Sequence, residues 1–269
     1  MNYTSINSPS NKYAKFILSL HDADSRRKNN KFIIEGLNLV NEALLLDINF
    51  DFVAVNIDFI ENPKFLKLLA KITDKSKVIY FDNKIFSKLV TTSSQCNVLA
   101  VIDKFKYNLT DIPNRGSIIV LDNIQDPANM GSIFRIASAY DVSGIIMTKG
   151  CVDVYNPKVV RATAAQLFKI PHVYLNNNYE IISFIKSSNR IITTLDSNSK
   201  LSIYKSKITL DRAIVIGNEG HGVSADLADS SREILKIPTN SQLDSLNVSI
   251  SLAIALNYWW SKCNGFDKA

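Results

Sequence analysis

The stretch "IVIGNEGHGVS" (residues 214–224) joins a run of branched apolar residues to a loop with three glycines, a carboxylate and a histidine. A continuous apolar run is typical of a parallel strand that is buried on both faces. Gly217, Gly220 and Gly222 follow the order G-x-x-G-x-G, which matches neither the dinucleotide fingerprint nor a P-loop. A plain tight turn and a loop whose backbone approaches a ligand both remain, and Glu219 favours a cationic ligand over a phosphate.

Strand-like and helix-like segments alternate along the chain, which indicates an α/β fold. The runs of the second half are apolar on both faces and predict a parallel sheet. The predicted strands are 32–36, 51–56, 77–81, 97–102, 117–121, 144–148, 190–195, 213–217 and 233–237. A polar segment without periodicity, residues 103–117, is interpreted as a linker. The predicted domains are residues 1–108 and 117–269.

The composition is that of a globular protein, with 46% hydrophobic residues in a chain of 269. No apolar run reaches the length of about 18 residues that a membrane span needs, and the N-terminus is polar, so we expect a cytoplasmic protein outside the membrane. The cysteines Cys96, Cys151 and Cys263 have no CxxC spacing, and the histidines are scattered. We therefore expect packing cysteines and no metal site.

The charge favours a polyanionic partner, because the formal net charge is +6. Part of the excess is concentrated in "SRRKNNK" (25–31), with Arg26, Arg27, Lys28 and Lys31. This basic cluster predicts contact with nucleic acid, and a solvated surface loop is the alternative.

A second loop of unusual composition is "LDNIQDPANMGSIFR" (121–135). Asn129 is expected to be the N-cap of the helix that follows, and Arg135 is expected on the polar face of that helix. A surface arginine with a packed stem explains Arg135 equally well.

A third such loop is "IPTNSQLDSLNVS" (237–249). A helix is expected to begin near Ser245 to Asn247. Its predicted buried stripe consists of Leu246, Ile250, Ala253 and Ile254. Capping alone is a sufficient explanation of Asn247.

Together the three loops resemble, in order and approximate spacing, the three motifs of the SpoU (TrmH) branch of the SPOUT RNA methyltransferases. Upstream, "FIIEGLNLVNEAL" (32–44) is similar to the start of the ribosomal-protein-like RNA-binding domain often fused to that catalytic domain. "NPKVVRATAAQLFKIP" (156–171) is similar to the helix between the first two motifs. The resemblance implies a small N-terminal α/β domain followed by a SPOUT α/β-knot domain, with a parallel sheet and a deep trefoil knot.

The resemblance also implies a function: 2′-O-ribose methylation of structured RNA with S-adenosylmethionine, by a homodimer. Because the methyl group of a sulfonium is already a good electrophile, this reaction requires no metal. The extra N-terminal domain favours 23S ribosomal RNA as the substrate. A tRNA 2′-O-methyltransferase and a non-catalytic RNA-binding or ribosome-assembly protein are the alternatives. A nicotinamide-dependent oxidoreductase is disfavoured by the order of the glycines.

Site residues follow from the same resemblance. The implied catalytic residues are Asn129, Arg135, Glu219 and Asn247. The implied cofactor contacts are Thr194, Leu195, Gly217, Asn218, Gly220, Ile237 and Leu246. The implied RNA contacts are Arg135 and the basic cluster. Because an arginine stays protonated, Arg135 is expected to position a phosphate and not to accept a proton. Thr239, Ser241 and Asp244 depart from the common Met, Gly and Glu, which concerns substrate choice more than activity.

Overall fold

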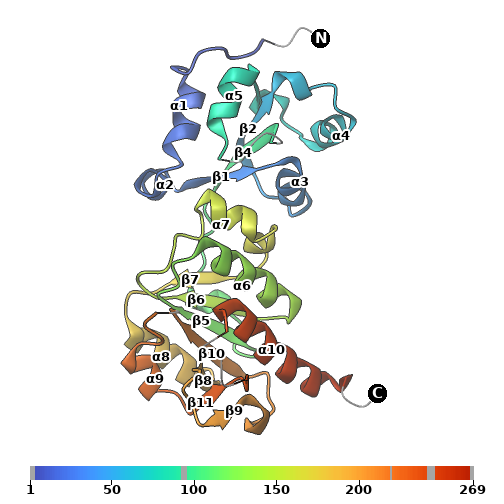
Figure 1. Cartoon of the computed structure of the whole chain (residues 1–269). Helices are drawn as coiled ribbons and strands as arrows, with labels where there is room; N and C mark the ends of the chain where they lie inside the picture. The colour runs from blue at the N-terminus through green and yellow to red at the C-terminus, as the bar shows by residue number, and fades with distance from the viewer. Residues whose placement is uncertain (1–3, 92–95, 219, 241–245, 267–269) are drawn as a thin grey trace. The chain divides into compact units, whose positions relative to one another are not determined.

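The computed structural model describes residues 4–91, 96–218, 220–240 and 246–266 (Figure 1). The chain folds as two compact units: residues 1–105 with 153–168 form the first, and residues 106–152 with 169–269 form the second. The first division falls within the segment interpreted as a linker. No helix of the described ranges is long and apolar enough to cross a membrane.

The first unit is built on a four-stranded mixed sheet in the order β1-β4-β2-β3. β4 is antiparallel to β1 and β2, and β2 is parallel to β3. The strands are β1 (Lys31–Glu35), β2 (Phe50–Asn56), β3 (Val78–Phe81) and β4 (Val98–Asp103). The helices are α1 (Lys12–Ser19), α2 (Ala23–Asn29), α3 (Leu37–Leu45), α4 (Pro63–Lys71), α5 (Asn83–Leu89) and α7 (Pro157–Ala162). All four predicted strands are confirmed, whereas α1 and α2 were not predicted.

One face of this sheet is covered by α1 and α5. Ile17 of α1 and Phe86 of α5 belong to the same buried cluster as Phe52 of β2 and Val101 of β4. Burial of these large apolar side chains is the main source of stability of such a layer.

Residues 153–168 belong to the first unit, although the predicted boundary placed them in the second domain. The ring of Tyr155 packs on Phe32 of β1 with a centroid distance of 4.7 Å. Arg161 of α7 lies 3.3 Å from the Glu35 carboxylate, which is buried. These contacts join sequence-distant segments, so the strand and helix pattern of the sequence could not predict them.

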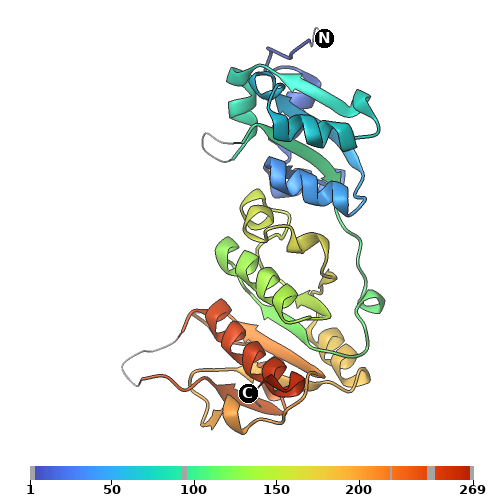
Figure 2. The same cartoon turned by 90° about the vertical axis from the view of Figure 1, so that its right-hand side faces the viewer.

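The second unit is built on a seven-stranded sheet in the order β7-β6-β5-β10-β8-β11-β9. In Figure 2 the C-terminal helix of the chain, in red, lies over strands of this sheet. Every described pairing is parallel, which confirms the predicted sheet. The strands are β5 (Ile118–Asp122), β6 (Gly144–Met147), β7 (His172–Tyr174), β8 (Ile191–Leu195), β9 (Leu201–Ser202), β10 (Arg212–Gly217) and β11 (Glu233–Lys236). The helices are α6 (Pro127–Ala139), α8 (Asn178–Ser187), α9 (Ala225–Asp229) and α10 (Val248–Asn264). The short edge strands β7 and β9 were not predicted.

Helices cover both faces of this sheet. α8 and α9 pack on one face, where Ile185 and Leu227 join a buried cluster with Val120 and Val215. α6 and α10 lie side by side on the other face (Figure 1). Because both faces are covered, the strands need continuous apolar sequence.

The predicted buried stripe of α10 is wrong. The buried residues of this helix are Val248, Ser249, Leu252, Ala255, Leu256 and Trp259. Ile250 is 52% exposed, and Ala253 and Ile254 are only partly buried. Most of the helix is apolar, so the sequence pattern contained two possible apolar faces and did not identify the one that packs on the sheet.

Candidate active site

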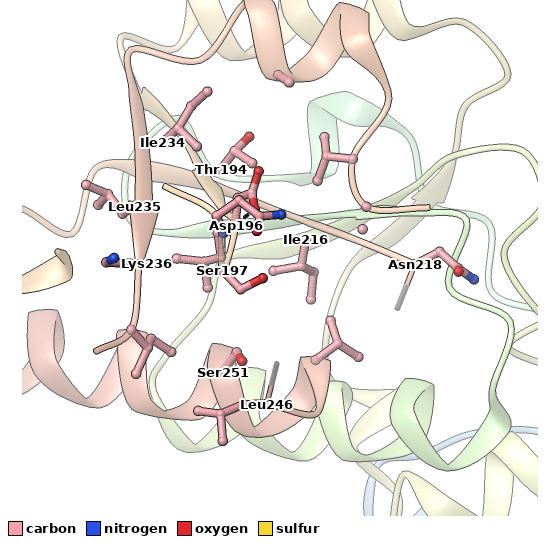
Figure 3. Close-up of a pocket in the computed structure, with 18 of the residues that line it drawn as sticks. Thr194, Asp196, Ser197, Ile216, Asn218, Ile234, Leu235, Lys236, Leu246 and Ser251 are labelled. Atoms are coloured by element: carbon pink, nitrogen blue, oxygen red, sulfur yellow. Dashed lines mark hydrogen bonds between the residues drawn. The ribbon is translucent and has the colours of Figure 1, made fainter. Parts of the chain in front are cut away.

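A cavity of about 720 Å³ lies at the carboxyl ends of β8, β10 and β11 (Figure 3). It is lined by all seven residues that the resemblance implied as cofactor contacts, namely Thr194, Leu195, Gly217, Asn218, Gly220, Ile237 and Leu246. The carboxyl ends of parallel strands are where α/β sheets bind ligands. The volume is also in the usual range of small-molecule sites, roughly 300 to 1,000 Å³.

The walls of the cavity come from different elements (Figure 3). Leu235 and Lys236 of β11 line one side, and Asn218 lies on the opposite side. Leu246 lies just before α10, and Ser251 lies on that helix. The lining therefore combines apolar side chains with polar groups, which suits a ligand with an apolar ring and a polar tail.

Polar residues that directly follow β8 also line the cavity and were not predicted: Asp196, Ser197 and Asn198. Asp196 accepts a hydrogen bond from the Asn198 backbone N–H at 2.8 Å, so this turn has a fixed local shape. Their position in the sequence could have indicated this role. They directly follow the predicted strand 190–195, whose last two residues, Thr194 and Leu195, were already implied as cofactor contacts.

The glycines of the loop after β10 have different roles. A Cβ on Gly217 would lie 2.1 Å from the Gly222 carbonyl oxygen, so only glycine fits there. Gly222 has a φ of 69°, which favours glycine. At Gly220 a Cβ would only reach 3.4 Å from the nearest atom, the Asn218 Oδ1. Two of the three glycines are thus required by the turn itself.

Asn218 holds this loop in place. Its Nδ2 donates to the Asn123 carbonyl at 3.1 Å, and its Oδ1 accepts from the Gly220 N–H at 2.8 Å. Its carbonyl accepts from the Gly222 N–H at 2.8 Å. The loop backbone therefore faces the cavity in a defined conformation.

Glu219, one of the four implied catalytic residues, lies outside the described residues. The departing positions Ser241 and Asp244 also lie outside them.

Asn129 and Asn247 are brought together by the fold. The Nδ2 of Asn247 donates to the Oδ1 of Asn129 at 2.9 Å, although the residues are 118 positions apart. Asn247 is the N-cap of α10, and its Oδ1 accepts from the Ser249 N–H at 3.0 Å. The cap prediction for Asn247 is confirmed.

The N-cap prediction for Asn129 is wrong. Asp126 caps α6 by accepting from the Ala128 N–H at 2.7 Å, and Pro127 is the first helical residue, where its missing N–H costs nothing. Asn129 lies inside the first turn and is buried, with 7% exposure. Its side chain is thus available for contacts beyond the helix end, such as the one with Asn247.

Arg135 lies on the exposed face of α6, as predicted. In the described part of the chain, no hydrogen bond or ion pair involves its side chain. Its guanidinium is therefore accessible to a partner in solution.

Three members of the basic cluster, Arg26, Arg27 and Lys28, lie on helix α2 and not on a loop, and Lys31 is the first residue of β1. The four members differ in exposure. Arg27 and Lys28 are exposed. Lys31 is held by Asp103 at 2.9 Å and by Asp51 at 3.4 Å. Although burial lowers the pKa of Lys31, the hydrogen bond and charge of Asp103, with those of Asp51, raise it overall.

Arg26 is a correction to the implied RNA contacts. Its side chain is only 2% exposed, and its guanidinium lies 2.7 Å from the Asp153 carboxylate. It also donates to the carbonyls of Leu20 and His21. An arginine whose donors are used inside the protein cannot contact a phosphate, and the sequence spacing did not reveal this.

Burial shifts the pKa of His172 and that of Cys151, a partly buried residue. Burial lowers the pKa of His172 to about 4, and burial raises the pKa of the Cys151 thiol. Neither residue lines the cavity. Among the residues that the structure describes, no group of three or more His, Cys, Asp or Glu side chains could hold a metal ion.

Comparison with known proteins agrees with this geometry. Residues 116–257 match the SpoU rRNA Methylase family, and residues 11–100 match the MRM3-like substrate binding domain. The chain is 26% identical over 261 residues to the 23S rRNA (guanosine(2553)-2′-O)-methyltransferase RlmP of Bacillus subtilis, covering 93% of this chain and 96% of RlmP. It is also 26% identical over 254 residues to an uncharacterized tRNA/rRNA methyltransferase of Synechocystis, covering 94% of this chain and 92% of that protein.

The fold is shared with a solved structure, the AdoMet-bound rRNA methyltransferase from Sinorhizobium meliloti. The TM-score is 0.85 at 24% sequence identity, covering 97% of this chain and 98% of that one. The family match spans more than half of the chain, and the resemblance drawn from the three loops is confirmed. The chain therefore belongs to the SpoU rRNA Methylase family.

Proposed function

We propose that this protein transfers a methyl group from S-adenosylmethionine to a ribose 2′-hydroxyl of RNA, with 23S ribosomal RNA as the substrate. The observation that carries the proposal is the cavity at the ends of β8, β10 and β11, whose lining contains all seven implied cofactor contacts. A non-catalytic RNA-binding protein would need no such cavity. The relatives named above, including a 23S rRNA 2′-O-methyltransferase, support the reaction and the substrate class.

The lining fits the cofactor chemically. Ile216, Ile237 and Leu246 offer apolar surface to an adenine ring, and Asp196 offers a carboxylate to a ribose or an amino acid tail. When bound, S-adenosylmethionine supplies an electrophilic methyl group on a positively charged sulfur. The residues of the chain that we assign to the cofactor bind and orient it.

The remaining task of the site is to hold the hydroxyl in line and to accept its proton. We assign phosphate positioning to Arg135, whose exposed guanidinium can bind a phosphate through two hydrogen bonds. We assign orientation of the ribose to Asn129, held in turn by Asn247. Carboxamides do not titrate near neutral pH, so neither asparagine serves as the base. Glu219 remains the carboxylate that the resemblance assigns to this site.

A homodimer is part of the proposal. Support comes from the apolar face of α10 that is not packed on its own sheet: Ile250 is 52% exposed, and Ile254 and Trp260 are only partly buried. Such a face is typical of an interface between subunits. A cytoplasmic location, the absence of a metal and the trefoil knot also remain predictions.

Two experiments test the proposal. Titration of the purified protein with S-adenosylmethionine and with NAD should give saturable binding of the first alone. Mapping of 2′-O-methylated nucleotides in total RNA, from cells with and without the protein, should show one site in 23S rRNA that depends on the protein. A dependent site in tRNA would support the alternative substrate, and binding of NAD without the sulfonium compound would refute the proposed function.

A further inference from the structure

We propose that Asp122 is a positioning residue that fixes the cofactor loop, defined as residues 217–218 and 220–224, and thereby sets the affinity for S-adenosylmethionine. This inference rests on the proposed function. Asp122 is the last residue of β5 and does not itself line the cavity. It was not among the site residues implied by the sequence.

Asp122 holds the far end of the cofactor loop. Its carboxylate is buried, with 7% exposure. One oxygen, Oδ2, accepts from the backbone N–H of Ser224 at 2.7 Å, and the other, Oδ1, accepts from the Thr148 hydroxyl at 2.9 Å. Both contacts are short hydrogen bonds to a charged acceptor, which are stronger than neutral ones.

The near end of the loop is held by the same strand. Gly217 is the register partner of Asp122 in the parallel pairing of β10 with β5. Between the two ends, the Asn218 side chain donates to the carbonyl of Asn123, the residue after Asp122. The cofactor loop is thus attached at three points to the end of β5.

A buried carboxylate is costly unless it has strong partners. Among the described residues, no lysine or arginine forms an ion pair with Asp122. Its partners are instead the backbone N–H of Ser224 and the Thr148 hydroxyl, so the buried carboxylate keeps both partners only while the loop holds Ser224 in this position. Because Gly217, Asn218, Gly220, Gly222 and Val223 line the cavity, release of Ser224 would move one wall of it.

The test is isothermal titration calorimetry with S-adenosylmethionine. The proteins compared are the full-length wild type, Asp122→Ala and Asp122→Asn. We expect the Kd to rise at least tenfold in Asp122→Ala. In Asp122→Asn the amide keeps one acceptor for Ser224, and its NH₂ group can donate to the Thr148 hydroxyl, so the rise should be only two- to fivefold. The matched control is Ser117→Ala, in which a buried serine just before the other end of β5 loses its partly buried hydrogen bond to the Leu210 carbonyl. Its Kd should stay within twofold of the wild type.

A Kd within twofold of the Ser117→Ala value in both Asp122 variants would overturn the inference, since a purely structural role would lower only thermal stability. If Asp122→Ala does not fold, Asp122→Asn decides alone by the same criterion. Absence of binding by the wild type would instead refute the proposed function, so the two failures are distinguishable.

Discussion

Asn247 donates a hydrogen bond across 2.9 Å to Asn129, and this bond joins the N-cap of α10 to the first turn of α6. The orientation of the amide follows from its cap role: because Oδ1 accepts from the backbone N–H of Ser249 and Ile250, Nδ2 is left to donate. The bond links the first and third sequence motifs. Asn247 also stands between Leu246 and Val248, which both line the cavity.

Asn247→Asp should separate capping from catalysis. Aspartate caps a helix as well as asparagine, but it has no N–H for Asn129. We expect thermal stability to stay close to that of the wild type and methyl transfer to fall at least tenfold at saturating cofactor. Asn247→Ala should lose both stability and methyl transfer, with an unfolding free energy lower by about 1 kcal/mol. Full activity of Asn247→Asp in a radiolabelled methyl transfer assay would contradict a role for the bond.

Arg135→Ala should abolish methyl transfer while the affinity for S-adenosylmethionine stays within a few fold, because we assign Arg135 to the RNA. The measurements are single-turnover methylation and cofactor titration. Arg115, another exposed arginine of the second unit, provides the matched control, and Arg115→Ala should retain activity. Loss of cofactor binding in Arg135→Ala would show that the assignment to the RNA is wrong.

Arg27 and Lys28 should contribute to RNA affinity through charge. Replacing both by alanine should weaken RNA binding and reduce the slope of log K against log salt by up to about 1.8, or about 0.9 for each lost contact with a duplex phosphate. Filter binding at several salt concentrations measures this slope. An unchanged slope would support the alternative of a solvated surface segment.

Arg26→Ala should act on stability instead. It removes the ion pair of the partly buried Asp153 carboxylate, and we expect an unfolding free energy lower by on the order of 2 kcal/mol. The salt slope of RNA binding should not change. If Arg26→Ala were as stable as the wild type and reduced the salt slope of RNA binding, Arg26 would contact RNA, and its assignment to stability would be wrong.

Ala164 should accept glycine with a gain in stability. It is exposed and has a φ of 48°, a conformation that strains residues with a Cβ. Ala164→Gly should raise the unfolding free energy by about 0.5 to 1 kcal/mol, since relief of strain exceeds the entropy cost of glycine. Ala162→Gly, two residues earlier in α7, should lower it by up to about 1 kcal/mol. Denaturant unfolding measures both changes in unfolding free energy. A change of the same sign in Ala164→Gly and Ala162→Gly would contradict the prediction.

His172 should make stability depend on pH. Its folded pKa of about 4 lies below its unfolded value near 6.5, so the unfolded chain binds the proton first. The contribution of His172 is fully present above pH 6.5 and is lost as the pH falls toward 4, by up to about 3 kcal/mol. His172→Gln should lack this part of the pH dependence, as measured by denaturant unfolding from pH 7 to pH 4. Parallel pH curves for the two proteins would contradict the prediction.

The sequence by itself determined the α/β class, nine strands and the positions of the three loops. Hydrophobic periodicity and continuous apolar runs indicate buried strands, and glycine and proline indicate turns. Strands and loops could therefore be predicted, because these signals lie within the segments themselves. The resemblance then named seven of the residues that line the cavity and both members of the asparagine pair, because loops that follow parallel strands meet at one edge of the sheet.

Only the tertiary structure decided which residue of a local group faces the interior. Arg26 and Arg27 are adjacent in the sequence, yet one is buried on Asp153 and the other is exposed. The packed face of α10 and the hydrogen bond from Ser224 to Asp122 likewise depend on segments far apart in the chain. Long-range contacts fix these choices, and no local pattern of charge or hydrophobicity contains them.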